Sequence, residues 1–490
     1  MVSNIYIYDI SFLVLFTLFV IIFLYKKRKN LKRDGPMYLY PTKVGIDFID
    51  YVGTKYKRTI SVLSFIGIIT GYAMMIIMLY SIGQFVYVYL FKPEIVRLIK
   101  VPPIMPLVPY VPELFQIKFL KPFYFTYWII AIAVIAIFHE FAHGVVAKRY
   151  KVKIKSTGFG FLGPFLAAFV EPDEKQMQKK KKIQQISILS AGTFTNLVLS
   201  IIFFLILLLF FLMTYAPSGA MFNMYSPEIV NITDIQMIGK LPIKSLESKE
   251  LLKVIEGNNL SNDYVNGEER HLNLTKVIVN TKSYLIDINI LKEQLKDGKI
   301  EAVYLYKDLP AVKAGMQGTI IEINGEKVIT YPGLGNIMKK YKPGDKIIIK
   351  TKMNDKINEY EITLAEDSTK PGAGVIGIVY LDSKRSGVLG KIFNFFNFYQ
   401  KPGTEYEPKF NEDLIIFLYN LFWWLALINL SVALVNMLPM AMFDGGRMFM
   451  LTVWGITGSK RVGELAFKFI TYFILGALVV VMFGWAIAIF

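Results

Sequence analysis

Two histidines and a glutamate within five consecutive residues could form a hydrolytic metal centre. His139 and His143 are four residues apart in the apolar run IAIFHEFAHGVV, so a helix there would aim both imidazoles from one face at one ion. Glu140 follows the first histidine, where its carboxylate could take a proton from an attacking water and return it to a leaving amine. A pair of buried structural histidines is the alternative, but ionisable side chains inside an apolar helix are costly and usually functional.

A third ligand is required, because catalytic zinc sites use three protein side chains and keep one position for water. The chain contains no cysteine, which leaves His, Asp or Glu. His271, the remaining histidine, lies in a hydrophilic region and is interpreted as a solvated loop residue. Asp444 lies in an otherwise apolar stretch and could complete the set, if Pro439 and the Gly445–Gly446 pair break the helix and turn the carboxylate inward. A simple helix-ending turn is the alternative.

Membrane-spanning helices are the elements that would position these residues. The 490-residue chain is 54% hydrophobic and has a mean hydropathy of +0.44, which is too apolar for an ordinary soluble protein. A bilayer core of about 30 Å needs about 20 apolar residues of helix. The six stretches that qualify run approximately over Ile10–Tyr25, Ile60–Leu90, Pro122–Ala147, Ile186–Tyr215, Leu414–Leu438 and Leu465–Phe490.

Basic residues cluster beside these spans and account for the net charge of +17. The clusters are Lys26–Arg33, Lys55–Arg58, Lys148–Lys155, Lys175–Lys182 and Lys460–Arg461. Basic loops stay on the cytoplasmic side of a membrane, and six spans with an external N-terminus place every cluster there. We therefore expect an integral multi-pass protein of the cell membrane, embedded in the lipid bilayer, with its active site toward the cytoplasm and no nucleic-acid partner.

The polar segment between the fourth and fifth spans predicts an external β-rich domain. Strands are predicted at Ala302–Tyr306, Thr319–Ile323, Lys346–Lys352 and Tyr360–Leu364, with a turn at Asn324–Gly325 and a short helix from Pro310. The segment Leu309–Val328 resembles the core of a PDZ domain, although it lacks a clear Gly-Leu-Gly-Phe loop. A generic small β domain is the alternative. Pro227–Lys299 receives no assignment.

The expected organisation has four parts. Residues 1–121 hold the N-terminal spans and loops, 122–215 the first half of a membrane catalytic core, 216–413 the external region with a PDZ-like domain at about 300–380, and 414–490 the second half of the core. The fold class is thus a polytopic α-helical membrane protein with about six transmembrane helices and an inserted extracytoplasmic β-rich PDZ-like domain. Two further segments have two interpretations each. Ser156–Pro172 predicts a re-entrant hairpin or a buried structural loop. Val388–Tyr399 predicts an amphipathic segment in the membrane interface that leads into the fifth span, or a segment buried in the domain.

The combination of HEFAH with a distant N-x-x-P-x-x-x-x-D-G-G, separated by a PDZ-like insert, resembles the site-2 protease family of intramembrane metalloproteases. The resemblance covers roughly Phe123 to the C-terminus. It implies one zinc ion per chain, held by His139, His143 and Asp444, with Glu140 activating water. It also implies that the enzyme hydrolyses a peptide bond in a transmembrane segment of a single-pass membrane protein, as a step of regulated intramembrane proteolysis.

The same resemblance singles out two asparagines that would bind substrate or the oxyanion. Asn436 matches the asparagine of the second motif, and its amide could stabilise the oxyanion or an unwound substrate strand. Asn196 matches a similar family position, although it could simply bridge helices. Thr193 and Ala441 stand where prolines are usual in the family, so the local backbone there is expected to differ.

Two other classes of protein use intramembrane His, Asp and Asn. A metal-binding transporter could line its ion path with them, but the sequence has no evident internal repeat, and Glu140 has no obvious task in transport. An inactive PDZ scaffold is the third possibility, and the intact HExxH with Asp444 speaks against it. The sequence leaves the substrate, the trigger and the oligomeric state open.

Overall fold

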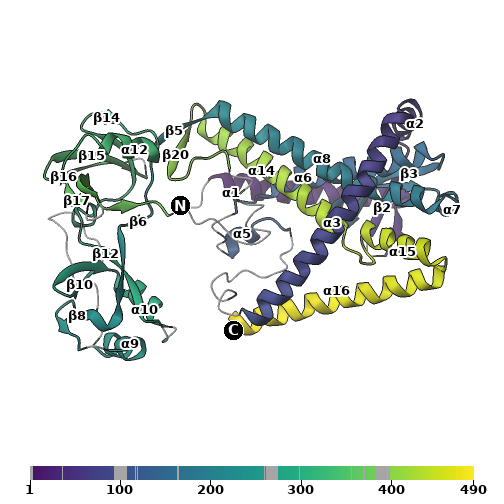
Figure 1. Cartoon of the computed structure of the whole chain (residues 1–490). Helices are drawn as coiled ribbons and strands as arrows, with labels where there is room; N and C mark the ends of the chain where they lie inside the picture. Colours follow the sequence, from purple (N-terminus) through teal and green to yellow (C-terminus); the bar gives the residue numbers. More distant parts are fainter. Residues whose placement is uncertain are drawn as a thin grey trace. The chain divides into compact units, whose positions relative to one another are not determined.

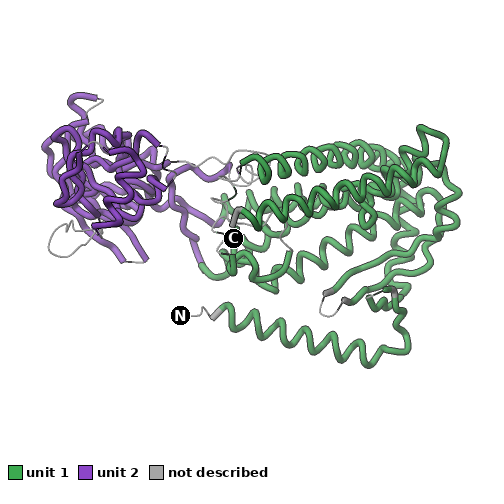
Figure 2. The backbone as a smooth tube through the Cα atoms, turned by 90° about the horizontal axis from the view of Figure 1, so that it is seen from below, with its two compact units in different colours: residues 1–213, 412–490 green, residues 214–411 purple. Residues whose placement is uncertain are grey.

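The computed structural model describes residues 4–35, 37–92, 96, 107–115, 117, 120–162, 165–244, 246–258, 260, 274–296, 298, 300–354, 356–367, 370–381, 394 and 398–489. They form two compact units: unit 1 comprises 1–213 and 412–490, and unit 2 comprises 214–411 (Figures 1 and 2). His271 and most of Val388–Tyr399 lie outside the described residues.

Six described helices, all in unit 1, are long and apolar enough to cross a membrane, as predicted. They are α1 (Asn4–Lys27), α3 (Lys57–Phe91), α6 (Phe125–Arg149), α8 (Lys182–Thr214), α14 (Glu412–Asn436) and α16 (Lys460–Ile489). Helix α8 illustrates why they form: its 33 residues contain no proline and are dominated by Leu, Ile and Phe. In a helix every internal backbone group is hydrogen-bonded, which makes such an apolar segment compatible with lipid.

Helix α14 ends at Asn436, and a separate helix, α15 (Asp444–Thr457), begins at Asp444. The intervening residues 437–443 form turns and bends. The predicted break around Pro439 is therefore confirmed. It redirects the chain, so that Asp444 opens a new helix instead of ending an old one.

The role predicted for the glycine pair is wrong, because Gly445 and Gly446 lie inside the first turn of α15. Their lack of a side chain serves close packing instead. A Cβ added at Gly445 would lie 2.4 Å from the carbonyl oxygen of Met437, and one at Gly446 would lie 2.0 Å from that of Met440. The loop before α15 can therefore fold directly onto the turn that carries Asp444.

A four-stranded antiparallel sheet accompanies the helices of unit 1 in the order β1–β2–β3–β4. Its strands are β1 (Lys32–Asp34), β2 (Met37–Thr42), β3 (Ile154–Leu162) and β4 (Phe165–Pro172), and the short helices are η1 (Arg28–Asn30), α2 (Ile46–Lys55), α5 (Val111–Leu114) and α7 (Glu174–Gln178). The hairpin predicted in Ser156–Pro172 thus exists as β3 and β4, while its insertion into a membrane stays a prediction. Strand β4 is an edge strand and lies along α6.

Unit 2 contains a first sheet, of which the sequence predicted a single strand. Its six strands run in the order β7–β12–β11–β10–β8–β9, namely β7 (Pro227–Asn231), β8 (Ile235–Ile238), β9 (Leu241–Pro242), β10 (Thr275–Val279), β11 (Lys282–Ile286) and β12 (Ala302–Lys307), with η2 (Ile232–Asp234), α9 (Ser248–Gly257) and α10 (Ile288–Leu295). The strand predicted at Ala302–Tyr306 is real, but grouping it with the PDZ-like segment is wrong: it pairs with β7 and β11. It packs into the first sheet's own apolar core.

A second sheet follows, in the order β16–β15–β13–β5–β20, with β14 beside β13. Its elements are β5 (Tyr215–Ala220), α11 (Pro310–Lys313), β13 (Thr319–Ile323), β14 (Glu326–Lys327), α12 (Tyr331–Met338), β15 (Lys346–Met353), β16 (Lys356–Thr363) and β20 (Thr404–Pro408), flanked by the pairs β17 (Ala365–Asp367) with β18 (Lys370–Val375) and β6 (Met224–Tyr225) with β19 (Ile378–Val379). The predicted strands, short helix and turn at Asn324–Gly325 are confirmed. A PDZ identity for this sheet stays a prediction.

The element order strand, turn, strand, helix, strand occurs twice in unit 2, a recurrence that the sequence analysis missed. It runs through β10, β11, α10 and β12, and again through β13, β14, α12 and β15. Both two-residue turns, Asn280–Thr281 and Asn324–Gly325, have positive φ at both positions, which is the geometry that joins twisted antiparallel strands. The pairing differs, since β12 adds to β11 whereas β15 adds to β13.

Candidate metal centre

Helix α6 begins under a cap supplied by another helix. Asp9 of α1 accepts hydrogen bonds from the backbone N–H groups of Phe125 (2.7 Å) and Thr126 (2.9 Å) and from the Thr126 hydroxyl (2.6 Å). The Tyr110 hydroxyl donates to the same carboxylate at 2.5 Å. Asp9 itself is only 5% exposed. Free N–H groups and a partial positive charge mark a helix N-terminus. The Asp9 carboxylate therefore fixes the start of the helix that carries both histidines.

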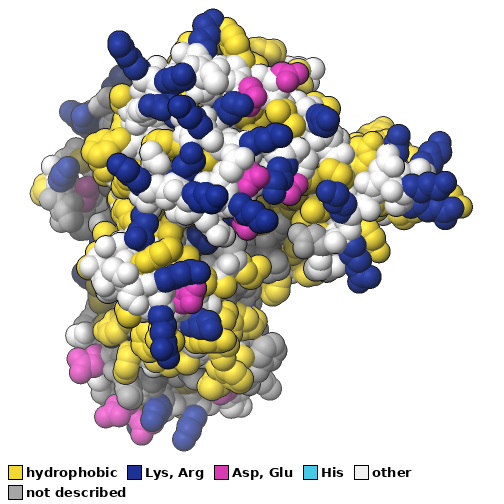
Figure 3. All heavy atoms as spheres, turned by 90° about the vertical axis from the view of Figure 1, so that its right-hand side faces the viewer, with side chains coloured by type: hydrophobic (Ala, Val, Ile, Leu, Met, Phe, Trp, Pro, Cys, Tyr) yellow, Lys and Arg dark blue, Asp and Glu magenta, His cyan; other side chains and the backbone are white. Residues whose placement is uncertain are grey.

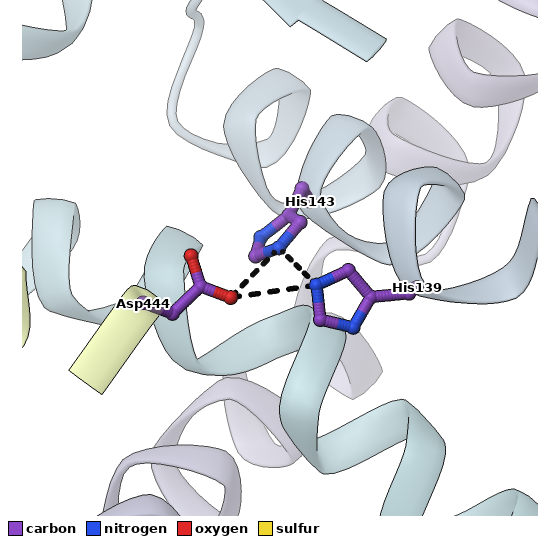
Figure 4. A group of neighbouring side chains, drawn as sticks. All are labelled: His139, His143 and Asp444. Carbon is purple, nitrogen blue, oxygen red and sulfur yellow. Dashed lines mark hydrogen bonds and ion pairs between the residues drawn. The ribbon is translucent and has the colours of Figure 1, made fainter. Parts of the chain in front are cut away.

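Three side chains converge where α6 meets the start of α15 (Figure 4). Nε2 of His139 and Nε2 of His143 lie 3.4 Å and 3.3 Å from Oδ2 of Asp444, and the two Nε2 atoms are 3.0 Å apart. Ligands held about 2.0 to 2.1 Å from zinc at tetrahedral angles are about 3.3 Å from one another. The donor atoms thus already have the spacing of a zinc site. Their side chains are between 11% and 19% exposed, so the site is shielded without being closed.

The outer nitrogens of both histidines are engaged on the side away from Asp444. Nδ1 of His143 lies 2.7 Å from the carbonyl oxygen of Ile188, to which it can donate a proton. Nδ1 of His139 lies 3.1 Å from the side-chain amide nitrogen of Asn196. Asn196 is fully buried, and its Oδ1 has no hydrogen-bond partner among the described residues.

These outer contacts fit a bound metal. A histidine that coordinates through Nε2 carries its proton on Nδ1, and that proton needs an acceptor. A half-turn of the Asn196 amide brings its orphaned oxygen to Nδ1 of His139 and satisfies both groups. With Ile188 serving His143 in the same way, both Nε2 lone pairs are left to face the metal position.

Gly192 of α8 lies against the Nε2 atoms of the two imidazoles, and the sequence analysis missed it. A Cβ added at Gly192 would lie 2.5 Å from Nε2 of His143 and 2.6 Å from Nε2 of His139. Real Cβ atoms do not approach other atoms so closely, so the rings can occupy these positions only beside glycine. The available signal was the run of small residues Ser190, Ala191 and Gly192 in an apolar helix, which is typical of close helix packing.

Glu140, the residue that follows His139 in α6, is held by the edge strand. Its Oε2 accepts a hydrogen bond from the backbone N–H of Val170 in β4 at 3.1 Å. The side chain also lines a cavity of about 270 Å³ between α2, α6 and the strands β2 to β4, whose other walls include Ile137, Phe159 and Ala168. A carboxylate that borders a largely apolar cavity can exchange protons with a substrate bound there.

The two asparagines expected to bind substrate have different surroundings. Asn196 contacts His139 from behind the ring, an arrangement that suits positioning the ligand. Asn436 is the last residue of α14 and is partly exposed; among the described residues its side chain forms no hydrogen bond with the three ligands. An oxyanion role for either residue stays a prediction.

Comparison of the sequence with known proteins identifies the family of this chain. An uncharacterised protein of the archaeon Methanocaldococcus jannaschii is 42% identical over 72 residues, which span 14% of this chain and 20% of that relative. A family model described as peptidase family M50 matches residues 127–481, well over half of the chain and all of its metal-centre residues from His139 to Asp444. Members of that family are metallopeptidases. The family match and the six apolar helices of this chain together indicate a multi-pass membrane protein. The chain belongs to peptidase family M50, the site-2 protease family.

Proposed function

We propose that this protein is an intramembrane zinc metallopeptidase that hydrolyses peptide bonds in transmembrane segments of single-pass membrane proteins. The observation that carries the proposal is the convergence of two Nε2 atoms and one carboxylate oxygen at zinc spacing. The two histidines lie on α6, which is long and apolar enough to cross a membrane, and the carboxylate lies at the start of α15. Glu140 follows the first ligand in sequence and lies next to an apolar cavity. A transporter would need the ligands, but not a carboxylate placed as a base.

The residues have separable tasks. His139, His143 and Asp444 would hold the ion, which supplies a Lewis acid that polarises the peptide carbonyl. Glu140 takes the proton of the attacking water and returns it to the leaving amine. Both carboxylate and water remain in a shielded site, where charge interactions are stronger than in bulk water.

A transmembrane substrate must unwind beside these residues, because hydrogen bonds inside a helix shield the peptide carbonyl. Strand β4 offers a place for the unwound segment: it is an edge strand, and its Val170 is bonded to Glu140. A strand added to such an edge gains backbone hydrogen bonds in place of those lost from its helix. The cavity of about 270 Å³ beside Glu140 would then accept an apolar side chain near the scissile bond.

The decisive test compares the wild type with Glu140→Gln in detergent, measuring both bound zinc and cleavage of a reporter transmembrane segment. We expect Glu140→Gln to retain stoichiometric zinc and lose about 10²- to 10⁴-fold in rate, the usual contribution of a general base. Glu464→Gln is the matched control, because within the described part of the chain Glu464 pairs only with Lys460 in α16. Equal cleavage by wild type and Glu140→Gln would refute the assignment.

A wild-type protein that holds zinc but cleaves none of several transmembrane segments would point to the other classes. Flux of metal ions into proteoliposomes would then identify a transporter, and its absence a scaffold. The flux measurement is needed because transporters also place ionisable side chains within the membrane.

We further propose that the protein lies in the cell membrane with unit 2 outside and the metal centre toward the cytoplasm. The basic ends of α1, α6 and α8 support this orientation. Because the chain has no cysteine, single cysteines can report it. A membrane-impermeant maleimide added to cells should label Thr281→Cys in unit 2 but not Ser459→Cys before α16; the reverse pattern would invert the orientation.

A further inference from the structure

A hollow in unit 1 is lined mainly by cations. It has a volume of about 380 Å³ and lies where α2 ends, α3 begins and α6 runs into β3. Its lining residues are Thr54, Lys57, Lys148, Arg149, Lys151, Val152, Lys153 and Gln176, five of which are Lys or Arg and none acidic. Figure 3 shows Lys and Arg side chains gathered over this end of unit 1. We call the hollow the basic pocket.

Two of the five cations already have partners that fix them in the wall. Nζ of Lys148 forms an ion pair with Asp50 at 2.6 Å. Nε of Arg149 donates to the Ser61 hydroxyl at 3.0 Å and to the backbone carbonyl of Lys57 at 3.0 Å. These contacts tie the end of α6 to α2 and α3.

The other three cations of the basic pocket have no ion-pair or hydrogen-bond partner of this kind among the described residues. The side chains of Lys57, Lys151 and Lys153 are exposed and form no hydrogen bond or ion pair among the described residues. Lys151 has φ 59, in a tight turn closed by a hydrogen bond from the backbone N–H of Val152 to the carbonyl of Ala147 at 2.9 Å. Three like charges thus lie around one hollow, where a bound anion would reduce their mutual repulsion.

The position of the pocket indicates where that anion comes from. Lys57 is the first residue of α3 and Arg149 the last of α6, and both helices are long and apolar enough to cross a membrane. Helix ends of this kind lie at the level of lipid headgroups, and basic pockets between them bind phosphate-bearing headgroups. Positive loops alone account for charge on this side, but not for a hollow in which three cations without a partner among the described residues line one space.

We propose that the basic pocket binds the phosphodiester headgroup of an anionic lipid. Lys57, Lys151 and Lys153 would contact the phosphate oxygens, and Thr54 and Gln176 could bond the attached alcohol. The occupied pocket would clamp the C-terminal end of α6, the helix that also carries His139 and Glu140. The inference does not depend on the peptidase activity, because binding can be measured by itself.

The test uses the full chain in lipid nanodiscs made of phosphatidylcholine with or without phosphatidylglycerol, and counts retained lipids by native mass spectrometry. The variant carries Lys57→Gln, Lys151→Gln and Lys153→Gln. The control carries Lys26→Gln, Lys27→Gln and Lys29→Gln, which remove the same charge from the exposed end of α1 and the segment after it. Unchanged zinc content verifies that each variant folds, and the single variant Lys151→Gln replaces the triple one if it does not.

We expect the wild type and the control to retain phosphatidylglycerol in preference to phosphatidylcholine. The pocket variant should lose affinity on the order of fivefold for each lysine removed. Equal losses in both triple variants would mean diffuse surface charge and overturn the proposal. Competition by millimolar inorganic phosphate without any phosphatidylglycerol preference would assign the pocket to a soluble anion, and also overturn it.

Discussion

The side-chain amide of Asn196 lies 3.1 Å from Nδ1 of His139, on the side of the ring opposite the atom that faces Asp444. This contact joins α8 to α6 and determines which nitrogen of His139 carries the proton. A ligand held in the wrong tautomer would present N–H instead of a lone pair to the metal. Asn196 is therefore a positioning residue, whose effect should appear in metal affinity.

Asn196→Leu should lower the affinity for zinc about 10- to 100-fold, which is typical when the partner of a metal-binding histidine is removed. Asn196→Asp, which retains an acceptor oxygen, should restore most of it. The affinities are measured by competition with a chromogenic chelator. Asn429→Leu is the matched control, since Asn429 is also a fully buried helix asparagine, yet it bonds the carbonyl of Leu425. Equal zinc affinity in the wild type and Asn196→Leu would exclude the positioning role.

Gly192→Ala should disrupt the centre although it adds a single methyl group. That group would lie 2.5 Å from Nε2 of His143, so the imidazoles must move off their common point. We expect zinc to be lost at chelator concentrations that leave the wild type loaded. Gly476→Ala in α16 is the control, because a Cβ there meets nothing within 4 Å. Full zinc retention by Gly192→Ala would mean that α8 does not constrain the ligands.

Asp9→Ala should destabilise the protein by removing the cap from α6. Loss of a helix cap typically costs about 0.5 to 2 kcal/mol, and the Tyr110 hydroxyl would also lose its acceptor. A lower temperature of thermal unfolding in detergent should report this. Ser11→Ala on the same helix is the control, because the one hydrogen bond of the exposed Ser11 hydroxyl to a described residue goes to the carbonyl of Ile7 in its own helix. Equal melting of the two variants would show that α1 contributes nothing through Asp9.

Removal of unit 2 should leave the metal centre intact and widen substrate selection. Unit 2 has its own two apolar cores, and its ends are adjacent: Tyr215 pairs with Pro408, and the Lys409 N–H donates to the Thr214 carbonyl at 2.9 Å. A short Gly-Ser linker can therefore replace 214–411. We expect unchanged zinc content, and cleavage of reporters with bulky external domains that the full chain rejects. Loss of zinc on deletion would mean that unit 2 is part of the catalytic fold.

The sequence determined those features that depend on neighbouring residues. Six apolar runs became six helices, because a segment that is apolar throughout is compatible with lipid only if it satisfies its backbone internally. His139 and His143 face one point because four residues make roughly one helical turn. Asp444 was identifiable because a carboxylate in an apolar stretch is costly unless it has a partner.

Only the tertiary structure decided which distant residues meet. Nothing in the local pattern of α8 places Gly192 against the histidines or Asn196 on Nδ1 of His139, and nothing around Asp9 identifies it as the cap of a helix more than 100 residues later. Strand Ala302–Lys307 has the same alternation of buried and exposed side chains whichever sheet it joins, so its pattern does not identify β7 as its partner. Local periodicity specifies a helix or a strand, whereas its neighbours are selected by packing between segments far apart in the chain, which no short window of sequence contains.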